Sequence, residues 1–221
     1  MSESTEISFS QEVLRKGIHL ISLSIPIIYV FVTRETALFI LVSLAITAIV
    51  IDFLSKFNNI IGILLKKYFG KMLRPHELNQ KYVLNGASWV FISAVACVFI
   101  FPKYLAVVSF TILIISDISA ALFGRKFGKH KLFTNKSWEG TFAFMISAIV
   151  VVFIYGIIFN APIIFFIGGI TASIVGGFIE AASTKLKVDD NLSIPISVAS
   201  VLYLFGVYAD SILTPFLHLI K

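Results

Sequence analysis

The chain has 221 residues, of which 58% are hydrophobic and 14% are charged, and its mean hydropathy is +0.96. Soluble domains carry about 25% charged residues, so the composition excludes an ordinary soluble domain and indicates a protein embedded in a lipid bilayer. The net charge of +6 lies between the apolar segments, where it favours membrane orientation and anionic headgroups over binding of nucleic acid.

The polar N-terminal segment, residues 1–13, lacks the basic start, short apolar core and small-residue cleavage site of a secretory signal. We therefore expect the first spanning segment to be retained. The single cysteine, Cys97, lies in an apolar run, which excludes a disulfide framework within the chain and a cysteine-based zinc site.

Seven apolar segments come close to the about 20 residues that a helix needs to cross the hydrocarbon core. They are residues 17–32, 37–53, 84–101, 104–123, 140–159, 162–182 and 192–209. Pro26 is expected to kink the first segment. We predict an all-α, polytopic membrane protein that forms a single integral membrane catalytic domain over residues 1–221.

The basic residues predict the direction of the chain. With the N-terminus inside, all but Arg34, Lys103 and Lys221 of the 18 Lys and Arg residues fall on the inner side. This bias predicts an inside N-terminus and an outside C-terminus. Residues 56–74 place apolar side chains at helical spacing with lysines elsewhere on the turn, which predicts an amphipathic helix in the inner interface.

Asp117 lies inside the fourth apolar segment, about six residues or roughly 9 Å before its predicted inner end. A carboxylate at that depth needs a partner. The partner is either an Arg or Lys of the next loop, in a structural ion pair, or a divalent cation shared with a nucleotide. Position alone leaves both open.

A basic, glycine-containing loop is predicted to follow. Ala120 and Gly124 have the small-residue spacing that lets helices pack closely. Gly128 is less well explained by packing, because it lies among cations where backbone amides can approach phosphate. The surrounding basic residues are Arg125, Lys126, Lys129, His130 and Lys131.

The next apolar segment opens with Lys136-Ser137-Trp138-Glu139-Gly140. Singly, each residue has a structural interpretation: Lys136 orients the segment, Trp138 lies in the interface and Glu139 favours the helix dipole. Those interpretations do not predict all of them together after a basic, glycine-containing loop.

More polar residues are predicted on the same inner side, whereas the outer side has nothing comparable. Four of them, spaced to share one helical face, are Glu12, Arg15, Lys16 and His19. The others are Arg74, Glu77, Glu180, Asp189, Asp190 and Asn191. The triplet Asp189-Asp190-Asn191 before the last segment suits a helix cap or a magnesium ion. This asymmetry predicts an active site at the inner face.

The pattern Asp117-x-x-Ala120-x-x-x-Gly124-Arg125-x-x-Gly128, followed by Lys136-Ser137-x-Glu139-Gly140, resembles the membrane CTP-dependent lipid kinases. That family includes dolichol kinase, phytol kinase and the CTP-using diacylglycerol kinase of fungi. The resemblance extends over nearly the whole chain through Glu12-x-x-Arg15-Lys16-x-x-His19, Arg74-x-x-Glu77, Glu180 and Asp190-Asn191 with Pro195. Ser116 departs from the pattern, since many relatives have glycine there.

The resemblance implies that CTP donates its γ-phosphoryl group to the hydroxyl of a membrane lipid at the cytoplasmic face. It implies Mg²⁺ bound by Asp117, Glu180 and Asp190. The residues implied for nucleotide binding are Arg74, Gly124, Arg125, Gly128, Lys129, Lys136, Ser137 and Asn191. Catalytic roles fall to Lys136, to Glu139 as an orienting group, and to Asp117, Glu180 or His19 as proton acceptor.

Two other functions stay open from the sequence. Phosphatidate cytidylyltransferases share a related central motif, although they have longer chains and usually Lys-Thr-Trp-Glu-Gly. A transporter could use Asp117 and Glu180 as an ion path, but the acids gather towards one face. The sequence leaves the acceptor open among a polyprenol, a shorter isoprenoid alcohol and diacylglycerol, and we favour an isoprenoid alcohol. It also leaves open whether UTP or ATP replaces CTP as donor, and what the oligomeric state is.

Overall fold

The structure of the protein, a computed structural model, describes residues 9–57, 60–69, 84–133, 136–186, 188–212 and 215–220. Its N-terminal helices are α1 (Phe9–Ile21), α2 (Ser24–Phe31), α3 (Arg34–Ser55) and α4 (Ile60–Phe69). The others are α6 (Gly86–Ile100), α7 (Lys103–Phe127), α8 (Trp138–Ile158), α9 (Ile163–Leu186) and α10 (Asp190–Ser211). Between α7 and α8 a short antiparallel hairpin pairs β1 (Lys131–Phe133) with β2 (Lys136–Ser137).

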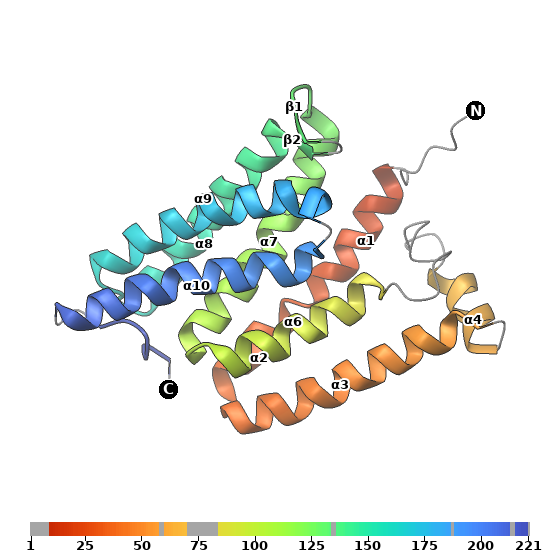
Figure 1. Cartoon of the computed structure of the whole chain (residues 1–221), viewed down its shortest axis with the longest axis horizontal. Coiled ribbons are helices and arrows are strands. Elements are labelled where there is room, and N and C mark those ends of the chain that lie inside the picture. The colour runs from red at the N-terminus through yellow and green to blue at the C-terminus, as the bar shows by residue number, and fades with distance from the viewer. Residues whose placement is uncertain are drawn as a thin grey trace.

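The predicted all-α, polytopic membrane fold is confirmed. Within the described residues, six helical stretches are long and apolar enough to cross a membrane, and α6 is a shorter apolar helix. In Figure 1 the start of α1, the end of α3, α4 and the start of α10 lie towards one side, whereas the end of α10 lies at the other. The number of crossings and the inside N-terminus stay predictions.

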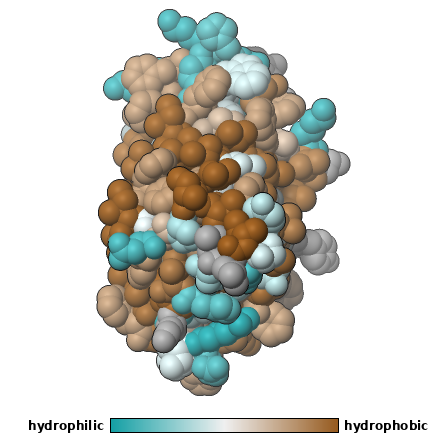
Figure 2. Space-filling model, turned by 90° about the vertical axis from the view of Figure 1, so that its left-hand side faces the viewer, coloured by the Kyte–Doolittle hydropathy of each residue, from teal (hydrophilic) through white to brown (hydrophobic). Residues whose placement is uncertain are grey.

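The centre of the fold is α7, which packs against α1, α2, α6, α8 and α10. Its residues from Tyr104 to Ile114 are all buried. By contrast, large apolar side chains such as Phe31 and Phe39 are about four-fifths exposed, at 81% and 77%. Figure 2 shows a face that is covered mostly by apolar side chains, as expected for a surface in contact with lipid.

The first predicted segment is longer than expected and is broken into α1 and α2. Pro26 has no N–H to donate to the carbonyl of Ser22, and the N–H of Ile25 donates to it instead at 3.0 Å. The predicted kink at Pro26 is therefore confirmed. Because α1 begins at Phe9 rather than at residue 17, Glu12 and its neighbours belong to the helix.

The predicted end of the fourth segment at residue 123 is wrong, because α7 continues to Phe127. Gly124 and Arg125 lie in its last turn rather than in a loop, and the N–H of Gly128 donates to the carbonyl of Gly124 at 3.0 Å. Asp117 is thus about ten residues, or roughly 15 Å, from the end of its helix.

The helix persists because its small residues let α8 cross it closely. A Cβ on Gly140 would lie 2.9 Å from the carbonyl oxygen of Ala120 and 3.1 Å from Cα of Gly124. A Cβ on Gly128 would collide with the carbonyl oxygen of Gly124 and lie 2.6 Å from Oγ of Ser137. Helix packing therefore explains Ala120 and Gly124, and contacts at the end of α7 explain Gly128.

The predicted amphipathic helix over residues 56–74 corresponds in part to α4, which covers Ile60–Phe69. Lys56 is not part of it, since this residue is the C-cap of α3. The rest of the predicted helix, including Arg74, lies outside the described residues.

Candidate active site

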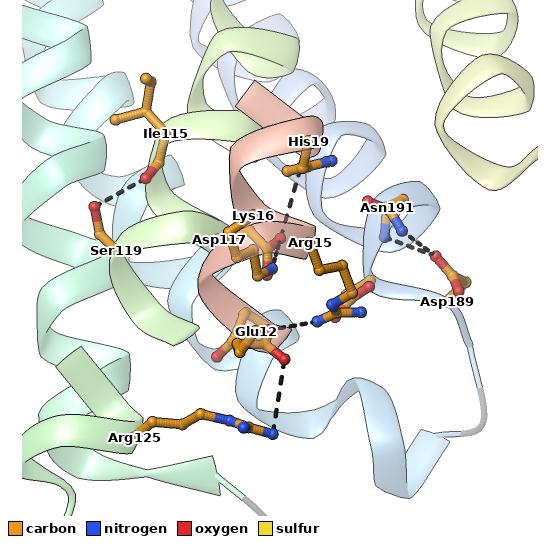
Figure 3. Close-up of polar contacts among 12 residues, drawn as sticks. Glu12, Arg15, Lys16, His19, Ile115, Asp117, Ser119, Arg125, Asp189 and Asn191 are labelled. Carbon is orange, nitrogen blue, oxygen red and sulfur yellow. Dashed lines mark hydrogen bonds and ion pairs between the residues drawn. The ribbon is translucent and has the colours of Figure 1, made fainter. Parts of the chain in front are cut away.

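Charged side chains from five elements converge near the ends of the helices that are predicted to face inside. Figure 3 shows those of α1 and α7 pointing towards one another, beside the start of α10. We call this group the charged cluster. Its members are Glu12, Arg15, Lys16, His19, Asp117, Arg125, Lys136, Glu180 and Asp190.

Asp117 is held by the first helix. Its carboxylate forms an ion pair with Lys16, and Nε2 of His19 lies 3.6 Å from the same Oδ2 atom. Lys16 and Asp117 are 5% and 4% exposed, so each charge offsets the cost of burying the other. An ion pair was one of the two expectations for Asp117. The basic partner, however, comes from α1 and not from the loop after α7, so that part of the expectation is wrong.

Glu12 ties the start of α1 to the end of α7. Its Oε1 atom accepts a hydrogen bond from Arg15 at 2.6 Å, and its Oε2 atom lies 3.7 Å from the guanidinium of Arg125. The carboxylate of Glu12 is buried, since this residue is only 3% exposed, whereas the side chains of both arginines are partly exposed.

Lys136 joins three elements. Its ammonium forms an ion pair with Glu180 of α9 and lies 4.0 Å from Oδ2 of Asp190 at the start of α10. Burial would lower the pKa of Lys136, but the carboxylates of Glu180, Asp190 and Asp117 outweigh that effect and raise it. The side chain therefore stays cationic at neutral pH.

The expected cap at the start of α10 is present. The Oδ1 atom of Asp189 accepts hydrogen bonds from the backbone N–H of Asn191 at 3.0 Å and from its side-chain amide at 2.8 Å. Asn191, expected to bind nucleotide, is thus engaged with Asp189 while it also lines the cavity described below.

Apart from Lys136, the predicted site residues in and beside the hairpin are not brought into the cluster. Glu139 accepts hydrogen bonds from the backbone of His130 at 3.2 Å and lies 2.7 Å from its Nδ1 atom. Ser137 is the N-cap of α8 and accepts from the N–H of Gly140 at 3.2 Å. Lys129 is exposed, and the amide of Gly128 is used within the helix end. These residues shape the turn between α7 and α8.

A cavity of about 670 Å³ adjoins the charged cluster, which is a size typical of small-molecule sites. Its polar end includes Arg15, Lys16, His19, Asp117, Asp190 and Asn191. Its other walls are mostly apolar and come from α1, α2, α3 and α6, with residues such as Ile25, Leu41 and Val90.

The cavity also opens towards the bilayer. Ile21 and Ile28 line it from α1 and α2, and Ile40 lines it from α3, yet these side chains are 69%, 54% and 45% exposed. An apolar wall that continues onto the lipid-facing surface gives a hydrocarbon chain a path to the polar end without crossing water.

A second polar group of the cavity was missed from the sequence. Asp52, which is 2% exposed, accepts a hydrogen bond from the N–H of Asn85 at 2.7 Å and lies 3.5 Å from Nζ of Lys56. The signal was available, because Asp52 is the one acid inside the apolar segment 37–53, just as Asp117 is in its own.

The carboxylates do not form a ready metal site. Among the residues that the structure describes, no three His, Cys, Asp or Glu side chains are grouped to hold an ion. Lysines occupy the positions beside the acids: Lys16 at Asp117, and Lys136 at Glu180 and Asp190. Binding of Mg²⁺ by Asp117, Glu180 and Asp190 stays a prediction.

Fold and site together define an integral membrane protein with a buried charged cluster beside a cavity open to lipid. The chain is 33% identical to the uncharacterized protein RP860 of Rickettsia prowazekii over 192 residues, which cover 86% of this chain and 92% of that protein. It belongs to the same family as RP860. No protein-family model matches the chain, and no solved structure does.

Two relatives carry functional names, and both come from Schizosaccharomyces pombe. The chain is 29% identical to CTP-dependent diacylglycerol kinase 1 over 156 residues, which cover 64% of this chain and 68% of the relative. It is 36% identical to dolichol kinase sec59 over 81 residues, which cover 36% of this chain but 16% of that longer protein.

Proposed function

We propose that this protein is a lipid kinase that transfers the γ-phosphoryl group of CTP to the hydroxyl of a membrane lipid. The observation that carries the proposal is the cavity, which joins the charged cluster to apolar walls open to the bilayer. A lipid alcohol there has its hydroxyl among charges and its chain in hydrocarbon. The names of the two yeast relatives support a lipid kinase, and the name of CTP-dependent diacylglycerol kinase 1 supports CTP as donor.

In this reaction the lipid hydroxyl oxygen bonds to the γ-phosphorus, the bond to the β–γ bridging oxygen breaks, and CDP leaves. Such a transfer needs positioning and neutralisation of charge more than covalent help from the protein. We assign neutralisation to Lys136 of β2, to Arg15 and Lys16 of α1, and to Arg125 of α7.

The hydroxyl proton needs an acceptor. Asp117 and His19 line the cavity, whereas Glu180 is not among its lining residues and forms an ion pair with Lys136. We therefore propose the adjacent pair of His19 and Asp117 as the proton-accepting unit, with Lys136 and Glu180 on the nucleotide side.

The test is a product analysis with the purified full chain, CTP labelled in its γ-phosphate, and separate lipid acceptors: dolichol, a shorter isoprenoid alcohol, diacylglycerol and phosphatidate. A kinase transfers the label to a lipid alcohol and leaves CDP. A cytidylyltransferase instead releases labelled pyrophosphate with phosphatidate and forms CDP-lipid. Label that never enters an alcohol, with any of these acceptors, contradicts the proposal.

Three further experiments address the donor, the metal ion and the side of the membrane. Unlabelled UTP and ATP as competitors test the choice of CTP. At a selective donor site, unlabelled CTP competes with the labelled CTP, and UTP and ATP do not. Removal of divalent cations by a chelator, followed by return of Mg²⁺, tests the predicted metal requirement. The reaction in sealed vesicles of known orientation tests the cytoplasmic face, because CTP does not cross the bilayer.

A further inference from the structure

A second buried ion pair, Asp52 with Lys56, lines the cavity on α3. Nζ of Lys56 lies 3.5 Å from Oδ1 of Asp52, and the two side chains are 8% and 2% exposed. A lysine near a membrane surface normally extends its ammonium to water. Here Lys56 is instead retained inside the wall of the cavity.

Asp52 also anchors the start of α6. The carboxylate of Asp52 accepts from the N–H of Asn85 at 2.7 Å and from the hydroxyl of Ser88 at 3.3 Å. The start of α6 has a cap of its own, since Oδ1 of Asn85 accepts from the N–H of Ser88 at 3.0 Å. Because Asp52 is fixed by these bonds and pairs with Lys56, the ammonium of Lys56 is held at the wall of the cavity.

The cavity thus has cations on two walls, with Arg15 and Lys16 on α1 and Lys56 on α3. An apolar passage open to lipid runs beside them. A ligand that suits both features has an anionic head able to meet more than one cation and a hydrocarbon tail. A phosphate monoester carries about −1.5 to −2 charges at pH 7 and three acceptor oxygens.

We propose that the cavity binds a lipid monophosphate and that Lys56, positioned by Asp52, is one of the residues that hold its phosphate. This inference rests on the proposed function, because a lipid monophosphate is the product of that kinase reaction. The same chemistry would serve a lipid monophosphate that enters as the substrate of a cytidylyl transfer.

The test measures binding without catalysis. The thermal unfolding midpoint of the full chain in detergent is followed against dodecyl phosphate, dodecanol and inorganic phosphate, with no nucleotide present. We expect dodecyl phosphate to raise the midpoint more than dodecanol does. Lys56→Met should weaken the apparent affinity for dodecyl phosphate by about tenfold and leave the response to dodecanol unchanged.

Matched variants separate the role of the phosphate contact from folding. Lys56→Arg should keep the affinity for dodecyl phosphate, and Lys131→Met, which removes an exposed lysine of the hairpin, should not alter it. Lys56→Gln replaces Lys56→Met if the latter does not fold. Unchanged affinity for dodecyl phosphate in the neutral variant overturns the proposal, as does equal stabilisation by inorganic phosphate.

Failure of this inference differs from failure of the kinase proposal. Phosphate binding that depends on Lys56, in a protein that phosphorylates no lipid alcohol, upholds the inference and rejects the kinase. With CTP present, release of pyrophosphate identifies the lipid monophosphate as a substrate. Inhibition of alcohol phosphorylation without pyrophosphate identifies it as the product.

Discussion

Buried acidic residues in this membrane protein are paired with lysines. Asp117 pairs with Lys16, and Glu180 pairs with Lys136, in each case from a distant part of the chain. A buried pair offsets its own desolvation only while both partners are present. A phosphate group can compete with a carboxylate for the same ammonium, so under the proposed function we expect these pairs to exchange partners when a nucleotide binds.

We predict that Asp117→Asn lowers turnover by about 100-fold or more, because it removes the carboxylate of the proposed proton-accepting unit. It also leaves the buried ammonium of Lys16 without its counter-charge, which costs about 3–5 kcal/mol in comparable pairs. The measurements are the initial rate of lipid phosphorylation and the thermal unfolding midpoint in detergent.

A double variant, Lys16→Met with Asp117→Leu, is the control for that result. It removes both charges, so the unfolding midpoint should recover towards that of the unaltered protein while activity stays lost. Full activity of Asp117→Asn would remove this carboxylate from catalysis, and recovery of activity in the double variant would show that only folding had been affected.

At Lys136 we expect an effect on the nucleotide. Lys136→Ala should raise the KM for CTP by about tenfold or more, since a charge-assisted hydrogen bond contributes about 1.5–3 kcal/mol. The KM for the lipid alcohol should change little. Steady-state kinetics with each substrate varied in turn measure both, and Lys131→Ala is the matched control from the same hairpin. Unchanged kcat and KM for CTP would contradict this assignment.

At the scale of elements, the crossing of α7 and α8 sets the position of the hairpin that carries Lys136. The backbones meet at Gly124 and Gly140, where an added Cβ would contact main-chain atoms that cannot move aside. This close crossing brings Lys136 towards α9 and α10.

We predict that Gly140→Ala lowers the unfolding midpoint, by an amount equivalent to about 1–3 kcal/mol, because its Cβ would lie 2.9 Å from the carbonyl oxygen of Ala120. Gly17→Ala in α1 is the control, since nothing lies within 4 Å of its Cβ position. That change should be neutral or stabilising, because alanine favours a helix over glycine. Equal midpoints for both variants would contradict the close crossing.

The spanning helices could be predicted from the sequence because length and hydropathy are local properties. The end of α7 could not, since it depends on contacts with α8. Residues far apart were correctly expected to gather on one side, as Lys136, Glu180 and Asp190 do. The sequence could not predict which acid pairs with which lysine. Lys16 and Asp117 are 101 residues apart, and no local pattern selects this lysine for that acid.

For the whole molecule, the proposed reaction requires that the charged cluster and the cavity face the compartment that contains the nucleotide. The helix ends near the cluster lie together in Figure 1, so a single orientation exposes all of them to one compartment. The excess of basic residues predicts that this compartment is the cytoplasm.

Single cysteines on opposite sides of the protein test that orientation. In a Cys97→Ala background, Lys131→Cys places a thiol on the exposed hairpin beside the cluster, and Glu35→Cys places one at the exposed start of α3. We expect a membrane-impermeant maleimide to label the Glu35 variant in intact cells and the Lys131 variant only after the membrane is opened. The positive-inside bias predicts that the hairpin lies inside, and under the proposed function the cluster takes CTP from the same compartment. The reverse labelling pattern would place the cluster away from its proposed donor and reject a cytoplasmic kinase.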